Sequence, residues 1–99
     1  MQFLKVDGSV MEHVAFIDDE NLAAVYYKDL KTVHFIWKQR TIGEPYRKAF
    51  IDAAEFAKSN ETVAFLSDIR KQGVVGPEDR KWFEAVALPS AIESGVKKV

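Results

Sequence analysis

Hydrophobic and polar positions alternate most clearly between residues 22 and 38, where two runs rich in β-branched and aromatic residues flank Asp29-Leu30-Lys31. Such runs are typical of strands, and the short polar break predicts a hairpin of Leu22–Lys28 and Thr32–Lys38. Successive side chains of a strand point to opposite faces of the sheet. We therefore expect the second run to bury one face, formed by Val33, Phe35 and Trp37.

The first twenty residues carry a weaker pattern. Phe3–Val6 and Glu12–Ile17 each have the composition of a short strand, with Asp7-Gly8-Ser9 as the turn between them. An irregular arm is the alternative interpretation, and the pattern alone leaves both open.

Apolar residues recur at helical spacing after residue 43. We expect the helix to begin at Gly43 or Glu44, because Pro45 then falls in the first turn, where its missing amide hydrogen is tolerated. Ser59-Asn60 ends it. One face alternates large and small apolar side chains, namely Tyr46, Ala49, Phe50, Ala53 and Ala57. The opposite face is expected in solvent and carries Arg47, Lys48, Asp52, Glu55 and Lys58.

The next apolar run, Thr62–Leu66, has no polar alternation. It predicts a strand that is central in the sheet or covered on both faces. Together with the hairpin and the helix before it, this strand forms a strand–helix–strand unit, which we expect to be a right-handed parallel crossover.

A second helix is predicted from Pro77, with Gly76 as its N-cap. Its inner stripe is expected to be Trp82, Phe83 and Val86, and Pro89 predicts a kink or a new helix start. We expect Ala91 and Ile92 to pack and Gly95 to end the helix. Val96–Val99 has the composition of another strand, so the domain looks unfinished or ends early in that strand.

Composition places all 99 residues in one domain, with 47% apolar content to form a core. A net charge of −1 provides no long-range attraction for nucleic acid or an anionic membrane surface. The chain has no cysteine, which excludes disulfides and thiolate chemistry and suits a cytoplasmic location. No segment has the length and apolarity of a membrane span.

Asp68 and Arg70 directly follow the strand predicted at Thr62–Leu66. Ligands of open α/β sheets bind at the carboxyl ends of strands, so this pair is a candidate polar site. The alternative is an ion pair that fixes the Ser67–Gly76 turn. Five aromatic residues also have two interpretations: they line a pocket for an apolar ligand, or they belong to the hydrophobic core. These residues are Trp37, Trp82, Tyr46, Tyr26 and Tyr27.

The sequence contains no coherent catalytic set. Ser67 lacks the Gly-x-Ser-x-Gly elbow of an activated nucleophile. His13 and His34 alone cannot form a metal site. Gly73–Gly76 lacks a Walker lysine, and the acidic residues after Pro77 would repel a phosphate. We therefore expect no enzyme activity, no cofactor and no metal.

Four segments together carry a family resemblance: Phe35-Ile36-Trp37-Lys38, Tyr46-Arg47, Asp68-Ile69-Arg70, and Pro77 to Trp82 with the later Pro89. From Leu22 onward the chain resembles small bacterial STAS-like proteins, which are similar to the sporulation anti-anti-sigma factor. A distant fold analogy reaches the CRAL-TRIO lipid-binding domains.

The resemblance implies a mixed sheet with helices packed on it, and a role in binding and regulation. The family's phosphorylatable serine stands in an Asp-Ser-Ser/Thr-Gly motif, and Leu66–Arg70 departs from it. Partner switching through Ser67 is therefore not expected.

We thus expect an α/β, STAS-like domain spanning residues 1–99, with an N-terminal antiparallel hairpin and parallel crossovers. Its expected function is that of a regulatory binding module that acts through protein–protein interaction or self-association. The alternative function is a carrier of a small apolar ligand or lipid in an aromatic-lined pocket. The expected binding residues are Asp68, Arg70, Trp82, Trp37 and Tyr46.

Overall fold

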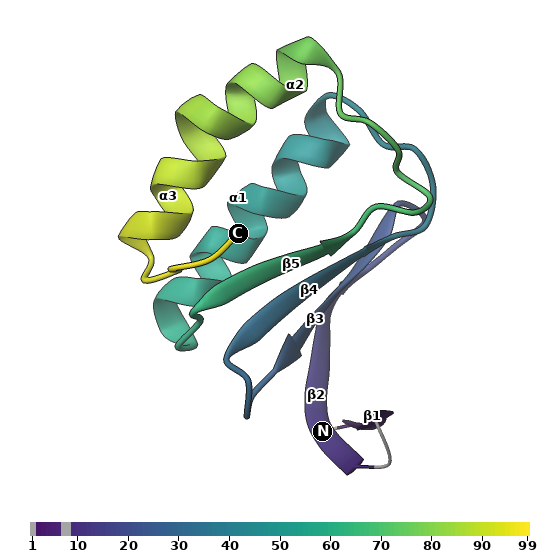
Figure 1. The fold of residues 1–99 in the computed structure, drawn as a ribbon, viewed down its shortest axis with the longest axis vertical. Coiled ribbons are helices and arrows are strands. Elements are labelled where there is room, and N and C mark those ends of the chain that lie inside the picture. Colours follow the sequence, from purple (N-terminus) through teal and green to yellow (C-terminus); the bar gives the residue numbers. More distant parts are fainter. Residues whose placement is uncertain (1, 7–8) are drawn as a thin grey trace.

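The computed structural model describes the backbone of residues 2–6 and 9–99 and the side chains of residues 12–99. Its elements follow one another along the chain as β1 (Gln2–Val6), β2 (Ser9–Asp18), β3 (Leu22–Tyr27), β4 (Thr32–Trp37), α1 (Glu44–Ser59), β5 (Ala64–Asp68), α2 (Pro77–Trp82), a π-helical turn η1 (Phe83–Ala87) and α3 (Leu88–Glu93) (Figure 1).

The described strands form one sheet in the order β1-β2-β3-β4-β5. Strands β1 to β4 pair antiparallel as a meander, and β4 pairs parallel with β5 across the connection that contains α1. This confirms the mixed α/β class, the hairpin and the parallel crossover. The two strands expected in the first twenty residues are present, whereas the expected turn at Asp7-Gly8 lies outside the described residues.

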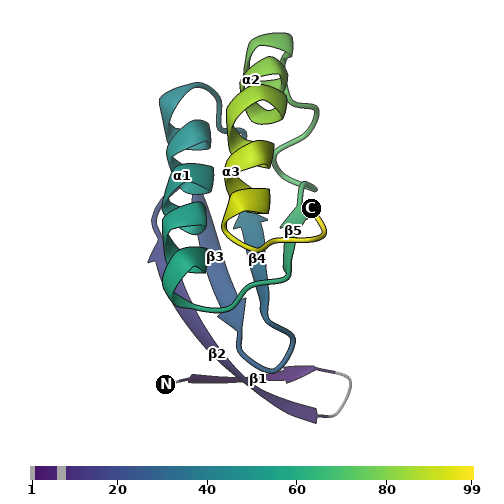
Figure 2. The ribbon, with the colours of Figure 1, turned by 90° about the vertical axis from the view of Figure 1, so that its left-hand side faces the viewer.

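The helices α1, α2 and α3 lie together on one face of the sheet (Figure 2). The core lies between the two layers, and the expected inner face of β4 is fully buried. Phe35 packs against Phe50 of α1 and Phe65 of β5, with ring centroids 4.8 and 5.3 Å apart. The expected apolar stripe of α1 is also buried, and small alanines within it let the helix approach the sheet closely.

The expectation of a central or doubly covered strand at residues 62–66 is wrong. Strand β5 follows β4 at the end of the sheet order, and Leu66 is 56% exposed while Phe65 is 5% exposed. The physical reason is that the helices cover one face only, so an apolar side chain on the other face of β5 stays in water. An unbroken apolar run therefore did not signal burial on both faces here.

Residues after Gly95 turn back along the outer edge of β5. The amide of Lys97 donates to the carbonyl of Val63 at 2.8 Å, and the amide of Phe65 donates to the carbonyl of Lys98 at 2.8 Å. A parallel bridge joins Ala64 and Lys98, but it is isolated and the segment after Gly95 forms no strand, so a domain that ends early in its last strand stays a prediction.

The second helical segment changes its winding before Pro89. The amide of Leu88 donates to the carbonyl of Phe83, which is the i to i+5 bond of a π-helix, and α3 then begins with Pro89 in its first turn. This confirms the expected new helix start. The expected packing of Val86 and Ile92 is wrong, because both are exposed. An extra residue in one turn shifts the phase of the helix, so a regular 3.6-residue stripe does not continue through η1.

Candidate functional site at the carboxyl end of the parallel strands

The loops after β4 and β5 meet at one end of the sheet (Figure 1), and a buried glutamine joins them. Gln72 is 2% exposed. Its Oε1 accepts the amide of Thr41 at 2.7 Å, and its Nε2 donates to the carbonyl of Thr41 at 2.6 Å. The side-chain amide thus satisfies both backbone groups of Thr41, as a neighbouring strand would.

Arg40 stabilises the loop that follows β5. Its Nη1 donates to the carbonyls of Gln72 and Val74 at 3.1 and 2.8 Å. Gly73 has φ 74°, and a β-carbon there would lie 3.4 Å from the same Nη1. A glycine therefore suits both the backbone conformation and the close approach of the guanidinium.

Asp79 ties α2 to the start of α1. Its Oδ2 accepts the amide of Gly43 at 2.9 Å and its Oδ1 accepts Nε of Arg47 at 3.0 Å. The Arg47 guanidinium also lies 5.6 Å from the centroid of Trp82, so this side chain is half-buried rather than on the solvent side as expected. The Gly43 amide is the main reason why the pKa of Asp79 lies below its ordinary value.

An apolar cleft of about 400 Å³ opens between these loops and the helices. Ile69 and Val74 are 54% and 76% exposed at its mouth. Tyr46 stacks on Trp37 with ring centroids 5.5 Å apart, and burial raises the pKa of Tyr46 to about 12, so its hydroxyl stays uncharged. The lining residues, which define the apolar cleft below, are Tyr46, Ile69, Gly73, Val74, Val75, Arg80 and Phe83.

A second groove of about 640 Å³ adjoins the apolar cleft and shares Val74, Val75 and Arg80 with it. Three cations line this groove, namely Arg40, Arg80 and Lys81, and we call them the cationic rim. Glu84 is the acidic residue of the same groove. Within residues 12–99, none of the three cations forms an ion pair with a carboxylate.

The structure forms the ion pair that was one interpretation of Asp68 and Arg70. Arg70 Nη2 lies 2.6 Å from Asp68 Oδ2, and its Nε lies 3.0 Å from Oδ1. The Arg70 amide also donates to Oδ1 at 3.2 Å, which closes the turn after β5. These hydrogen bonds from Arg70 lower the pKa of Asp68 to about 2.

The five expected binding residues do not form one site. Trp37 is buried in the core, while Tyr46 lines the apolar cleft. Trp82 borders a different groove, beside Ile51 and Asp52 of α1. Asp68 and Arg70 pair with each other at the end of β5. A binding role for these five residues stays a prediction.

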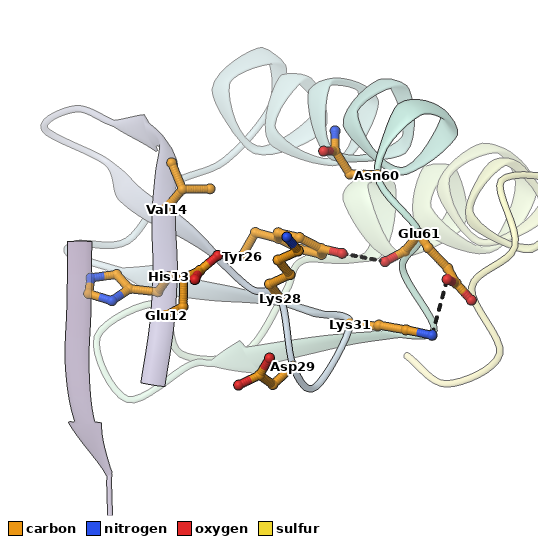
Figure 3. A pocket seen from close by; sticks show the side chains of 9 residues that line it. All are labelled: Glu12, His13, Val14, Tyr26, Lys28, Asp29, Lys31, Asn60 and Glu61. Atoms are coloured by element: carbon orange, nitrogen blue, oxygen red, sulfur yellow. Dashed lines mark hydrogen bonds and ion pairs between the residues drawn. The ribbon is translucent and has the colours of Figure 1, made fainter. Parts of the chain in front are cut away.

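A further groove of about 590 Å³ lies between the β3–β4 turn and the segment before β5 (Figure 3). The Tyr26 hydroxyl donates to the carbonyl of Glu61 at 2.5 Å, and Lys31 pairs with the Glu61 carboxylate at 3.1 Å. Burial is the main cause of the raised pKa of Tyr26, and the nearby negative charge of Glu61 raises it further. Because these polar groups bind each other, we assign them a structural role.

Gln72, Arg40 and Asp79 were not anticipated as site residues. Each of these side chains forms a hydrogen bond with a residue more than thirty positions away in the sequence. The glycines that follow Gln72 were the sequence signal for a constrained loop.

Within the described residues, no three His, Cys, Asp or Glu side chains gather as metal ligands, and no helix has the length and apolarity to cross a membrane.

No protein-family model matches this chain, and searches of curated proteins and of solved structures found no significant match. The resemblance to STAS-like proteins therefore stays a prediction.

Proposed function

We propose that this protein is a non-enzymatic binding module that docks a partner protein at the apolar cleft. The observation that carries the proposal is the exposure of Ile69 and Val74, at 54% and 76%, around a cleft at the carboxyl end of the parallel strands. Clustered exposed apolar side chains beside a cavity are typical of interaction surfaces. The carboxyl edge of parallel strands is also where α/β sheets bind their ligands.

Two observations on polar residues support binding over catalysis. The Asp68 carboxylate is held by Arg70 and has a pKa of about 2, so near neutral pH it is a poor proton donor or acceptor. His34 lies on the open face of the sheet, where its Nδ1 is 3.3 Å from the hydroxyl of Tyr27. Burial lowers the pKa of His34, which favours the neutral ring.

The regulatory, STAS-like and cytoplasmic assignments belong to the same proposal. They are supported by the resemblance of the four segments named above and by a mixed sheet of the kind that this resemblance implies. The absence of cysteine is compatible with a reducing compartment.

Photo-crosslinking tests the docking site. A benzophenone amino acid replaces Val74 in one variant and Leu30 in the matched control, because Leu30 is 53% exposed in the β3–β4 turn. In cells that express the protein naturally, we expect one discrete adduct from position 74 and none of the same mass from position 30. Adducts that are equal at both positions, or absent at position 74, would contradict the proposal.

A second candidate function is carriage of a small apolar ligand in the same cleft. It is favoured by the cleft volume of about 400 Å³, which lies within the usual range for small-molecule sites. Native mass spectrometry separates the two functions. A co-purified small molecule that is lost in a Val74→Asp variant supports the carrier, and an apo mass for freshly purified protein supports protein docking.

A further inference from the structure

We propose that the docked segment is an acidic peptide, with an apolar side chain in the apolar cleft and carboxylates on the cationic rim. This inference rests on the proposed function and adds the chemistry of the partner. The overall charge of −1 does not indicate whether the partner is acidic or basic, so the inference depends on the local charges.

The first argument is the shared wall. Val74, Val75 and Arg80 line both the apolar cleft and the neighbouring groove. An extended peptide advances about 3.3 Å per residue, so an apolar side chain and a carboxylate one or two residues away can reach both surfaces at once. A single short segment with both kinds of side chain therefore fits the site.

The second argument is the local imbalance of charge. The groove has three cations against one acidic residue, Glu84. Arg40 is oriented by two backbone carbonyls that accept from its Nη1. Among the side chains of residues 12–99, its Nε and Nη2 have no hydrogen-bond acceptor, so these donors are available to a ligand. An arginine pre-oriented in this way can bind a carboxylate with little further loss of side-chain entropy.

A peptide fits these features better than an anionic membrane does. Glu78 and Glu84 are exposed on the same helical segment as Arg80 and Lys81. A bilayer would extend over the whole segment and meet these carboxylates together with the cations, whereas a short peptide contacts only the part of the groove that its side chains reach. The apolar cleft beside the cations has room for an apolar side chain of a peptide, and a flat lipid surface presents no such side chain.

A selection from a random peptide display library on the full chain tests the inference. We expect the selected peptides to be enriched in Asp and Glu next to Leu, Ile or Phe. Binding of these peptides, measured by fluorescence anisotropy, should weaken about 10-fold in an Arg80→Gln/Lys81→Gln variant. A Lys97→Gln/Lys98→Gln variant removes the same charge elsewhere and should change the affinity less than about 2-fold.

The Val74→Asp variant separates the failure of this inference from the failure of the proposed function, and circular dichroism verifies its fold. Peptides that depend on Val74 but show no acidic enrichment would overturn the inference and leave the docking site intact. Peptides that bind Val74→Asp as well as the parent would overturn both. Co-sedimentation with phosphatidylserine vesicles that is lost in Arg80→Gln/Lys81→Gln would also overturn the acidic-peptide assignment.

Discussion

At the scale of single residues, the most consequential side chain of the candidate site is Gln72. Its amide is almost fully buried and satisfies both backbone groups of Thr41. A buried amide or carbonyl that loses its partner incurs the full penalty of desolvation, whereas an exposed hydrogen bond is replaced by water. The position of the loop that carries Ile69 and Val74 therefore depends on this side chain, together with the hydrogen bonds from Arg40.

We expect Gln72→Ala to lower the free energy of unfolding by about 2–4 kcal/mol, because two buried hydrogen bonds are lost and the Thr41 amide and carbonyl stay unpaired. Urea unfolding followed by circular dichroism measures the change. Gln39→Ala is the matched control, since the Gln39 side chain bonds Asn21 at an exposed position. Equal losses in the two variants would show that Gln72 is not a structural bridge.

At the scale of elements, β5 combines a buried face with an open one. Phe65 packs on Phe35 in the core, and its sequence neighbour Leu66 points into solvent. The two positions are adjacent and similarly apolar, and they differ in burial because the helices cover the face of β5 that carries Phe65 and not the face that carries Leu66.

Phe65→Ala should destabilise the protein by about 3–5 kcal/mol, whereas Leu66→Ala should change the stability by less than about 1 kcal/mol. The difference arises because only the first substitution leaves a cavity. Thermal and urea denaturation of both variants provide the comparison. A large loss in Leu66→Ala would mean that the open face of the sheet is covered in solution.

The contact between α1 and α2 depends on Asp79, which binds Gly43 and Arg47. Asp79→Ala removes both bonds and leaves the half-buried Arg47 without its carboxylate, so we expect a loss of about 2–3 kcal/mol. Glu78→Ala is the control, because the neighbouring Glu78 is exposed and should change stability by less than about 0.5 kcal/mol. Chemical denaturation of the two variants measures both changes in the free energy of unfolding. Similar losses in Asp79→Ala and Glu78→Ala would contradict the role of Asp79 in joining α2 to α1.

At the scale of the whole molecule, the titrations that are shifted in the acid and neutral range act in one direction. The pKa values of Asp68 and Asp79 are lowered by their hydrogen bonds, and that of His34 is lowered by burial. In each case the unfolded chain binds protons at a higher pH than the folded chain. The free energy of unfolding should therefore fall as the pH is lowered, first near the ordinary pKa of histidine and then through the carboxylate range.

Asp68 gives the clearest test of this pH dependence, because its pKa of about 2 in the folded protein lies below the ordinary aspartate value of 3.8. Its stabilising contribution is present above 3.8 and is lost as the pH falls to about 2. We expect Asp68→Asn to be less stable than the parent at neutral pH and equally stable at the acid limit. Urea midpoints measured across this pH range test the expectation, and a constant difference between the two proteins would contradict it.

The local pattern of residues was sufficient to predict the helices and strands and, for some of them, which face is buried. The period-two run of β4 and the helical stripe of α1 predicted their buried sides, and the prolines and glycines predicted the starts of α1 and α3. Asp68 and Arg70, which are two residues apart, were also recognisable as a pair. All these features depend on interactions between near neighbours, which the order of residues expresses directly.

Only the tertiary structure determined the one-sided covering of the sheet and the candidate site. Gln72 and Thr41 are separated by 31 positions, Arg40 and Val74 by 34, and Asp79 and Gly43 by 36. No periodicity links such distant residues. They meet because the parallel crossover brings the ends of β4 and β5 to the same edge, where buried backbone groups require partners from another loop.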